Sequence, residues 1–229
     1  MDWREKAKKM AAVKATTHIK EGFIVGLGSG TTVAYAFQEL SKRIREKKLQ
    51  IYGIPTSHQA FLLAVQHKIP TTTLDEHPQI DITIDGADQV DEELNMIKGM
   101  GGALTREKIV ASASKMNIAI IDETKLTKKL GINKPIPIEV LPFALSTVRA
   151  KLRTLNGKPI LREAEKKLGP VVTDNGNFIL DVYFGPFDNP KELNQTLKAI
   201  PGIVETGLFV EMADVVYVGG KDAVQKLEK

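Results

Sequence analysis

The first half of the chain alternates between short apolar runs and segments with helical periodicity, and this alternation limits the fold more than any other feature. The apolar runs have the length of buried strands and cover residues 23–26, 51–54, 80–84 and 118–121. The segments between them predict helices at residues 32–46, 57–67 and 105–114, and residues 2–19 predict a leading helix. Such an alternation is typical of a parallel sheet covered by helices, in which ligands bind beyond the carboxyl ends of the strands.

The pattern changes near Gly131, where a Lys-Pro-Ile-Pro segment indicates a linker. From there to about residue 210 the order is strand, helix, strand, strand, helix, strand, which is the ferredoxin-like order. A last apolar strand at 213–218 and a helix at 221–227 predict a return to the first domain. We therefore expect an α/β protein with a Rossmann-like parallel sheet domain (residues 1–130 and 207–229) and an inserted, smaller ferredoxin-like α+β domain (residues 131–206).

Composition excludes several classes of protein. The sequence has no cysteine, which removes disulfides, thiolate nucleophiles and zinc–thiolate sites together. The net charge is +4, but the lysines lie among glutamates rather than in a block, so we expect no nucleic-acid partner. No apolar run reaches 18 residues and the first residues lack the apolar core of a signal peptide, so we expect a cytoplasmic protein without a membrane partner.

A glycine-rich turn, Val25-Gly26-Leu27-Gly28-Ser29-Gly30-Thr31-Thr32, joins the second predicted helix to the strand before it. A dinucleotide fingerprint would need a third glycine at Thr31 and an acidic residue after the next strand, which instead ends in Pro-Thr-Ser; a P-loop would need a lysine. Two interpretations stay open. The backbone N–H groups and hydroxyls of this turn bind a phosphate, or the segment is only a tight turn into a helix.

A second motif, Asp85-Gly86-Ala87-Asp88, directly follows a buried strand. Two neighbouring carboxylates can hold sugar hydroxyls or shift each other's pKa for acid–base chemistry, and Gly86 and Ala87 leave room for a substrate. The alternatives are a turn in which aspartate caps backbone amides and a metal site built from oxygen atoms alone. The four histidines show no metal-ligand spacing, so we expect no metal; they are His18, His58, His67 and His77.

The third motif places a lysine before a glycine-rich loop that runs into a helix with Thr105 as its expected N-cap. Lys98 can meet a phosphate or a developing oxyanion, and the amides of the loop can face the same charge; the loop residues are Gly99, Met100 and Gly101. Glu107 falls in the first helical turn. An acidic residue there can be a catalytic base, or it can serve only the helix dipole.

Together these motifs resemble ribose-5-phosphate isomerase of the A type, over nearly the whole chain. The matching stretches are GLGSGTT, DGAD, KGMGGALTREK, DETK (Asp122–Lys125), PIEV, TDNGNFILD and IPGIVETGLF. Met100 stands where the family often has glycine, so its side chain must point away from the ligand. The resemblance implies Glu107 as general base, with Asp85, Asp88 and Lys98 as further catalytic residues. It implies substrate contacts from Gly28, Ser29, Gly30, Thr31, Asp85, Gly86, Ala87, Asp88, Lys98, Gly99, Met100, Gly101 and Lys125.

The implied reaction is the interconversion of D-ribose 5-phosphate and D-ribulose 5-phosphate through an enediolate, in the non-oxidative pentose phosphate pathway. Such a reaction needs a base, an oxyanion donor and groups that open the sugar ring, but no cofactor. The resemblance also implies a homo-oligomer, either dimer or tetramer. Two other functions stay open: an acyl-CoA transferase with a glutamate nucleophile, and a sugar-phosphate sensor, which would normally carry a helix-turn-helix module.

Overall fold

The computed structural model describes residues 2–228 and divides into two compact units. The first contains the described residues up to Ala87, Arg106–Leu126 and the residues from Met212 onward. The second contains Asp88–Thr105 and Thr127–Glu211. This division groups residues 88–105, 127–130 and 207–211 with the second unit, whereas the sequence analysis assigned them to the first domain.

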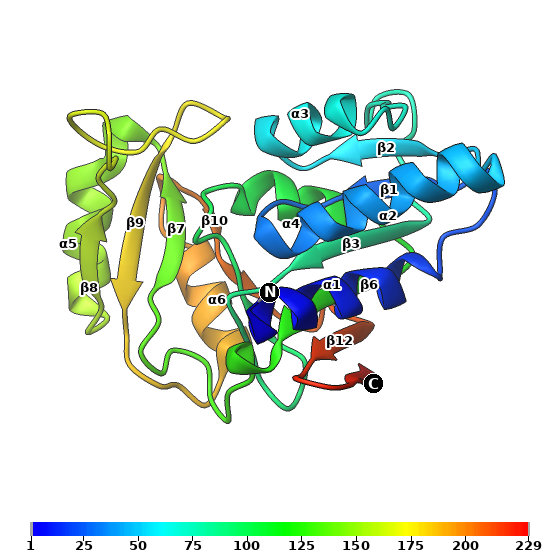
Figure 1. Cartoon of the computed structure of the whole chain (residues 1–229). Coiled ribbons are helices and arrows are strands. Elements are labelled where there is room, and N and C mark those ends of the chain that lie inside the picture. The colour runs from blue at the N-terminus through cyan, green and yellow to red at the C-terminus, as the bar shows by residue number, and fades with distance from the viewer. Residues whose placement is uncertain (1, 229) are drawn as a thin grey trace. The chain divides into compact units, whose positions relative to one another are not determined.

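The first unit is built on a six-stranded sheet (Figure 1). Its strand order is β13-β12-β6-β3-β1-β2. The bounds are β1 (Ile24–Leu27), β2 (Tyr52–Pro55), β3 (Ile82–Gly86), β6 (Asn117–Asp122), β12 (Val215–Gly219) and β13 (Val224–Glu228). The strands β2, β1, β3, β6 and β12 pair in parallel, which confirms the predicted parallel sheet.

The prediction of a helix at residues 221–227 is wrong, because this segment forms β13, which pairs antiparallel with β12. Gly220 N–H donates to the Ala223 carbonyl over 2.9 Å and closes a tight turn. The chain therefore reverses, and its backbone groups extend the sheet. The helix-forming side chains of this segment do not indicate such pairing.

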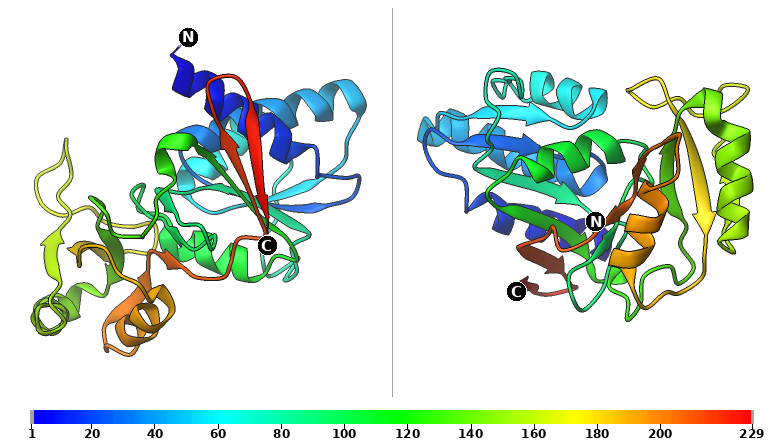
Figure 2. Two further views of the ribbon diagram at one scale, coloured as in Figure 1. Left: turned by 90° about the horizontal axis from the view of Figure 1, so that it is seen from below. Right: turned by 180° about the vertical axis from the view of Figure 1, so that it is seen from behind.

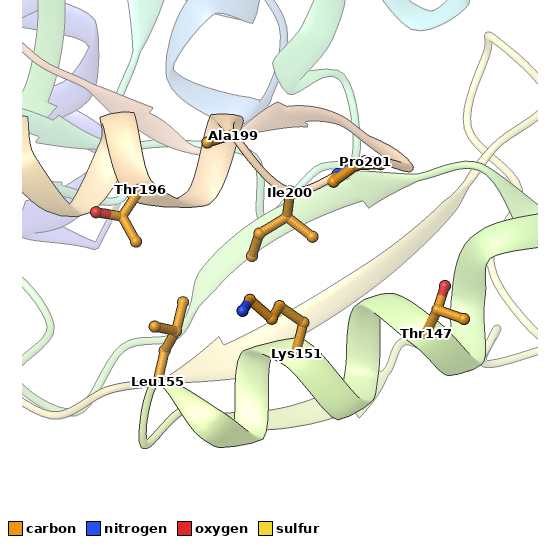
Figure 3. Close-up of a pocket in the computed structure, with 7 residues that line it drawn as sticks. All are labelled: Thr147, Lys151, Leu155, Thr196, Ala199, Ile200 and Pro201. Atoms are coloured by element: carbon orange, nitrogen blue, oxygen red, sulfur yellow. The ribbon is translucent and has the colours of Figure 1, made fainter.

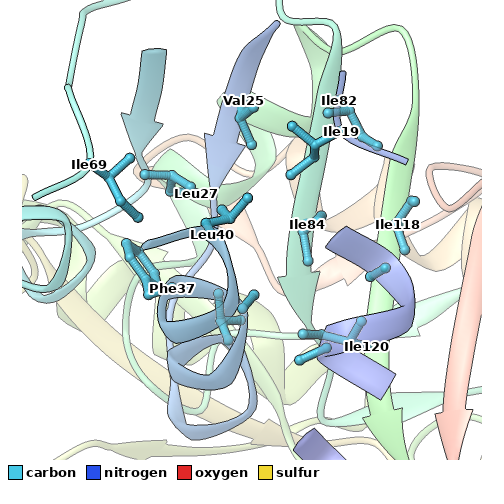
Figure 4. Close-up of a cluster of buried hydrophobic side chains, with 14 of the residues drawn as sticks. Ile19, Val25, Leu27, Phe37, Leu40, Ile69, Ile82, Ile84, Ile118 and Ile120 are labelled. Carbon is cyan, nitrogen blue, oxygen red and sulfur yellow. The ribbon is translucent and has the colours of Figure 1, made fainter. Parts of the chain in front are cut away.

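Helices cover both faces of this sheet. The helices α1 (Trp3–Thr16), α2 (Thr31–Lys47) and α3 (His58–Gln66) bury their apolar side chains against alternate residues of the strands, such as Val25 with Leu27 and Ile82 with Ile84 (Figure 4). The helix α4 (Leu104–Ser112) lies on the opposite face, where a Cβ at Gly26 would come within 2.7 Å of Val110 (Figure 2).

The second unit contains the predicted ferredoxin-like order, β7 (Ile136–Val140), α5 (Leu145–Thr154), β8 (Lys158–Leu161), β9 (Phe178–Tyr183), α6 (Pro190–Lys198) and β10 (Ile203–Thr206). The antiparallel sheet has the order β10-β7-β9-β8. Both helices pack on one face, where α5 and α6 share a core with Ile138 and Leu180. A short 3₁₀ helix, η2 (Pro142–Ala144), leads into α5, and another, η1 (Glu123–Lys125), belongs to the first unit.

A small third sheet, which the sequence analysis did not predict, lies in the second unit. Its strands are β4 (Gln89–Val90), β5 (Met96–Ile97) and β11 (Leu208–Phe209), paired antiparallel in the order β11-β5-β4. The last strand of the expected ferredoxin-like order is divided at Gly207 into β10 and β11, and a Cβ at Gly207 would lie 2.3 Å from the Lys98 carbonyl oxygen. Across residues 2–228, no helix has the length and apolar content needed to cross a bilayer.

Candidate active site

The glycine turn lies at the carboxyl end of β1, next to the end of β3. A Cβ at Gly28 would lie 2.2 Å from Asp85 Oδ1 and 2.6 Å from Asp85 Cα, so no side chain fits at this position. Ser29 N–H donates to Asp85 Oδ1 over 3.1 Å. The structure thus brings two separately predicted motifs into direct contact within the first unit.

A cluster of hydroxyl groups completes this turn. Ser29 Oγ lies 2.9 Å from Thr56 Oγ1 and 2.6 Å from Ser57 Oγ, and Gly30 N–H donates to Gln59 Oε1 over 3.0 Å. Ser57 is the N-cap of α3 and accepts a hydrogen bond from Ala60 N–H. Its second contact, with Ser29, and the role of Thr56 were missed. The signal was the Pro-Thr-Ser sequence at the end of β2, because neighbouring parallel strands end at the same edge of a sheet.

The Asp85 carboxylate is buried, with 7% of the residue exposed. Its Oδ1 accepts hydrogen bonds from Gly86 N–H at 2.7 Å and from Ser29 N–H at 3.1 Å. Gly86 and Ala87 are half-buried. A buried carboxylate held by backbone donors has a fixed orientation, as a group that binds or activates a hydroxyl requires.

Lys98 directly follows β5 in the second unit and is 4% exposed. Its backbone N–H donates to the Gly207 carbonyl over 2.8 Å, and its Nζ lies 5.3 Å from the centre of the Phe209 ring. The face of an aromatic ring attracts a cation at this distance. Contacts of both the backbone and the side chain therefore hold Lys98 in place before the glycine loop.

The loop after Lys98 turns at Gly99, whose φ of +99° favours glycine. Met100 N–H donates to Asp88 Oδ2 over 3.0 Å, so these two predicted residues are in contact. Arg162, which the sequence analysis did not single out, donates to the carbonyl oxygens of Gly99 and Met100 over 3.0 and 2.9 Å. Gly101 is exposed.

Glu107 lies in the first turn of α4 and is 5% exposed. The helix begins at Leu104, so the expectation that Thr105 is the N-cap is wrong. The Thr105 hydroxyl instead donates to Glu139 Oε2 over 2.5 Å. A buried glutamate is uncommon and differs from the exposed acidic residue that the helix dipole alone would favour.

Glu139, on β7, is fully buried and accepts hydrogen bonds from four side chains. The donors besides Thr105 all meet Oε1: Thr173 Oγ1 at 2.8 Å, Asn175 Nδ2 at 3.1 Å and Asn177 Nδ2 at 2.8 Å. This cluster fixes the start of α4 to β7 and to the turn before β9. Both stretches belong to the resemblance, which implied no role for Glu139.

Lys125 ends the 3₁₀ helix η1 and is half-buried. Asp122 caps this helix, accepting a hydrogen bond from Thr124 N–H over 3.0 Å. The cap fixes the segment that carries Lys125 at the carboxyl end of β6, the edge of the sheet where Asp85 also lies.

A groove between α5 and α6 in the second unit has a volume of about 660 Å³ (Figure 3). Lys151 and Leu155 face Thr196 and Ile200 across it, and none of the predicted site residues lines it. Within residues 2–228, no three or more histidine, aspartate or glutamate side chains are grouped so that they could hold a metal ion.

Comparison with known proteins agrees with these motifs. The family model described as ribose 5-phosphate isomerase A (phosphoriboisomerase A) matches residues 52–223. The ribose-5-phosphate isomerase A of Methanosarcina acetivorans is 49% identical over 220 residues, covering 96% of this chain and 93% of that protein. The protein of the same name from Thermococcus kodakarensis is 47% identical over 226 residues, covering 98% and 99%.

Two solved structures are similar over nearly their full length. A D-ribose-5-phosphate isomerase in complex with phospho-erythronic acid has a TM-score of 0.97 and 44% identity, with 99% of each chain covered. Ribose 5-phosphate isomerase A from Methanocaldococcus jannaschii has a TM-score of 0.95 and 44% identity, with 98% and 99% covered. The chain belongs to the ribose 5-phosphate isomerase A family, whose members are aldose–ketose isomerases.

Proposed function

We propose that this protein interconverts D-ribose 5-phosphate and D-ribulose 5-phosphate through an enediolate, with Glu107 as the base that moves the proton between C2 and C1. The observation that carries this role is the burial of Glu107 in the first turn of a helix that follows a lysine and a glycine loop. A carboxylate is a suitable base when burial and a helix N-terminus act on its pKa in opposite directions.

The remaining residues bind and polarise the sugar phosphate. Lys98 and the loop of Gly99, Met100 and Gly101 hold an anionic oxygen, either of the phosphate or of the enediolate. Asp85 and Asp88 bind hydroxyls and assist ring opening. Further substrate contacts come from Gly28, Ser29, Gly30, Thr31, Gly86, Ala87 and Lys125.

The ligand of a relative supports a substrate of this chemistry. The 44% identical isomerase was solved with phospho-erythronic acid, which carries a phosphate and a carboxylate. An enediolate of a sugar phosphate likewise has negative charge on its phosphate and on an oxygen at the other end of the molecule. A site for such a ligand needs several backbone and cationic donors, which the glycine turn and the Lys98 loop contain.

The reaction moves one proton from C2 to C1 and one from O2 to O1, and the two electrons stay within the molecule, so no nucleotide cofactor is needed. The proposed mechanism also uses no metal. The enzyme would act in the non-oxidative pentose phosphate pathway, in the cytoplasm, as a homo-oligomer (dimer or tetramer). We propose no nucleic-acid partner. An acyl-CoA transferase would form a thioester on its glutamate, and incubation with acyl-CoA followed by mass spectrometry distinguishes that function.

The Glu107→Gln variant tests the proposal most directly. It keeps the shape of the side chain but removes the base, and should lower turnover by roughly 10²–10⁴-fold, the usual contribution of a general base. Ligand affinity and folding should change much less. In deuterated water the wild-type ketose should carry deuterium at C1. A folded Glu107→Gln enzyme with near wild-type turnover would move the search for the base to Asp85 or Asp88.

A further inference from the structure

An arginine and an aspartate in the second unit form a rigid pair beside the Lys98 loop. Arg162 directly follows β8, and Asp181 lies on the neighbouring strand β9. Arg162 Nε donates to Asp181 Oδ2 over 2.8 Å, and Nη2 donates to Oδ1 over 2.5 Å. Only 13% and 16% of the two side chains are exposed. A partly buried two-point contact of this kind fixes the plane of the guanidinium group.

The third nitrogen of the guanidinium reaches the loop. Arg162 Nη1 donates to the Gly99 and Met100 carbonyl oxygens over 3.0 and 2.9 Å. Two consecutive peptide groups therefore direct their carbonyls toward the same cation. The loop lies on the face of the four-stranded sheet that α5 and α6 leave uncovered. A Cβ at Gly102 would meet Ile179 Cδ1 at 3.3 Å, and Ile179 points away from the core that its neighbour Leu180 shares with α5 and α6.

Because the peptide bond is planar, this contact also sets the direction of the N–H groups in the same peptides. In a trans peptide the C=O and N–H bonds point in opposite directions, so a carbonyl turned toward Arg162 sends the next residue's N–H away from it. Met100 N–H follows this rule, because it donates to Asp88 Oδ2 over 3.0 Å. Gly101 N–H, on the next peptide, must point to the same side as Asp88.

We propose that Arg162, oriented by Asp181, is a positioning residue that holds these two peptides so that the Met100 N–H stays on Asp88 and the Gly101 N–H faces the anionic oxygen of the ligand. Without the guanidinium the carbonyls lose their donor, and either peptide can rotate and present an oxygen to that anion instead. The inference deepens the proposed function and rests on it, because it assumes that the loop binds an anionic sugar derivative.

The test measures binding of phospho-erythronic acid by calorimetry, together with kcat and KM for ribose 5-phosphate. The Arg162→Ala variant should bind that acid roughly 10- to 100-fold more weakly, the effect of misplacing binding groups by about an ångström. Arg162→Lys should not restore affinity, because a single ammonium cannot serve Asp181 and two carbonyls together. Added guanidinium ion should restore part of the affinity of Arg162→Ala, and methylammonium should not.

The chain contains a matched control. Arg43, in α2, also donates to main-chain carbonyls: Nη2 to Ile19 over 2.8 Å and Nη1 to Thr16. The Arg43→Ala variant should lose stability to urea yet bind phospho-erythronic acid as tightly as the wild type. A binding defect that follows stability in both variants would make Arg162 a structural residue and overturn the inference.

A second measurement keeps the inference testable if Arg162→Ala does not fold. In the wild type, phospho-erythronic acid should slow hydrogen exchange at the exposed Gly101 amide; unchanged exchange there in the saturated protein overturns the inference. A wild type that neither isomerises ribose 5-phosphate nor binds the acid refutes the proposed function itself. An active wild type whose folded Arg162→Ala variant binds within twofold refutes the positioning role alone.

Discussion

Replacing Gly28 by alanine should damage the site more than its single added methyl group suggests. The new Cβ would lie 2.2 Å from Asp85 Oδ1 and 2.6 Å from Asp85 Cα, whereas ordinary contact begins at 3.4 Å. The carboxylate must therefore move by about 1.2 Å and the backbone by about 0.8 Å to relieve the contact. A displacement of about 1 Å in a positioned group costs roughly 10²-fold in rate, and overpacking costs about 1–3 kcal/mol in stability.

The assay is the initial rate of ketose formation from ribose 5-phosphate, with urea denaturation of each variant. Gly219→Ala is the matched control, because its Cβ would also lie 2.2 Å from its nearest neighbour, the Ala7 carbonyl oxygen in α1, a helix that carries none of the proposed site residues. Both variants should lose stability, and only Gly28→Ala should lose about 10²-fold in kcat/KM. Equal kcat/KM in Gly28→Ala and wild type, or equal losses in the two variants, would refute the reasoning.

Three further predictions concern other parts of the molecule. Glu139→Gln should lower the free energy of unfolding by about 1–3 kcal/mol in urea titrations, because the amide keeps one acceptor oxygen and its NH2 group cannot accept a hydrogen bond from the remaining donors; an unchanged midpoint contradicts this. Burial, and then the charge of Lys226, hold the pKa of His18 below its ordinary 6.5. The unfolded chain then takes up a proton at pH 6.5 that the folded chain does not, so stability should fall as the pH drops from 6.5 toward the folded pKa, and His18→Gln should flatten that part of the profile. Exhaustive dialysis against EDTA should leave the isomerase rate unchanged, and recovery of lost activity by a divalent cation would show that the metal-free mechanism is wrong.

The regular elements were predictable wherever local pattern and packing agree. Buried strands such as β1 and β3 are continuous apolar runs, and the ferredoxin-like order follows from alternating patterns alone. The strands β4 and β5 escaped prediction because each is two residues long and exists only through pairing with its neighbour and, for β5, with β11. The hairpin of β13 was missed for a similar reason: its stability comes from the β12 edge.

Some contacts of the site could likewise be predicted from the sequence pattern, whereas others depend on residues that are far apart in the chain. The contact of the glycine turn with Asp85 follows from two strands that end at one edge of a parallel sheet, which the sequence does indicate. The contacts of Arg162 with Gly99 and Met100 span more than sixty positions and depend on how β8 and β9 pair, so no spacing in the sequence reports them. The role of Glu139 was hidden likewise, because its donors lie 34 to 38 positions away.

The buried Glu139 cluster also restricts how this protein can be recombined with its relatives. Its members come from three separate stretches of chain, the start of α4, β7 and the turn before β9. A chimera that exchanged only one stretch for a sequence without the matching polar group would leave a buried carboxylate short of donors, or buried donors without an acceptor. Crossover points for shuffled libraries should therefore keep residues 105–177 from one parent, or transfer all three stretches together.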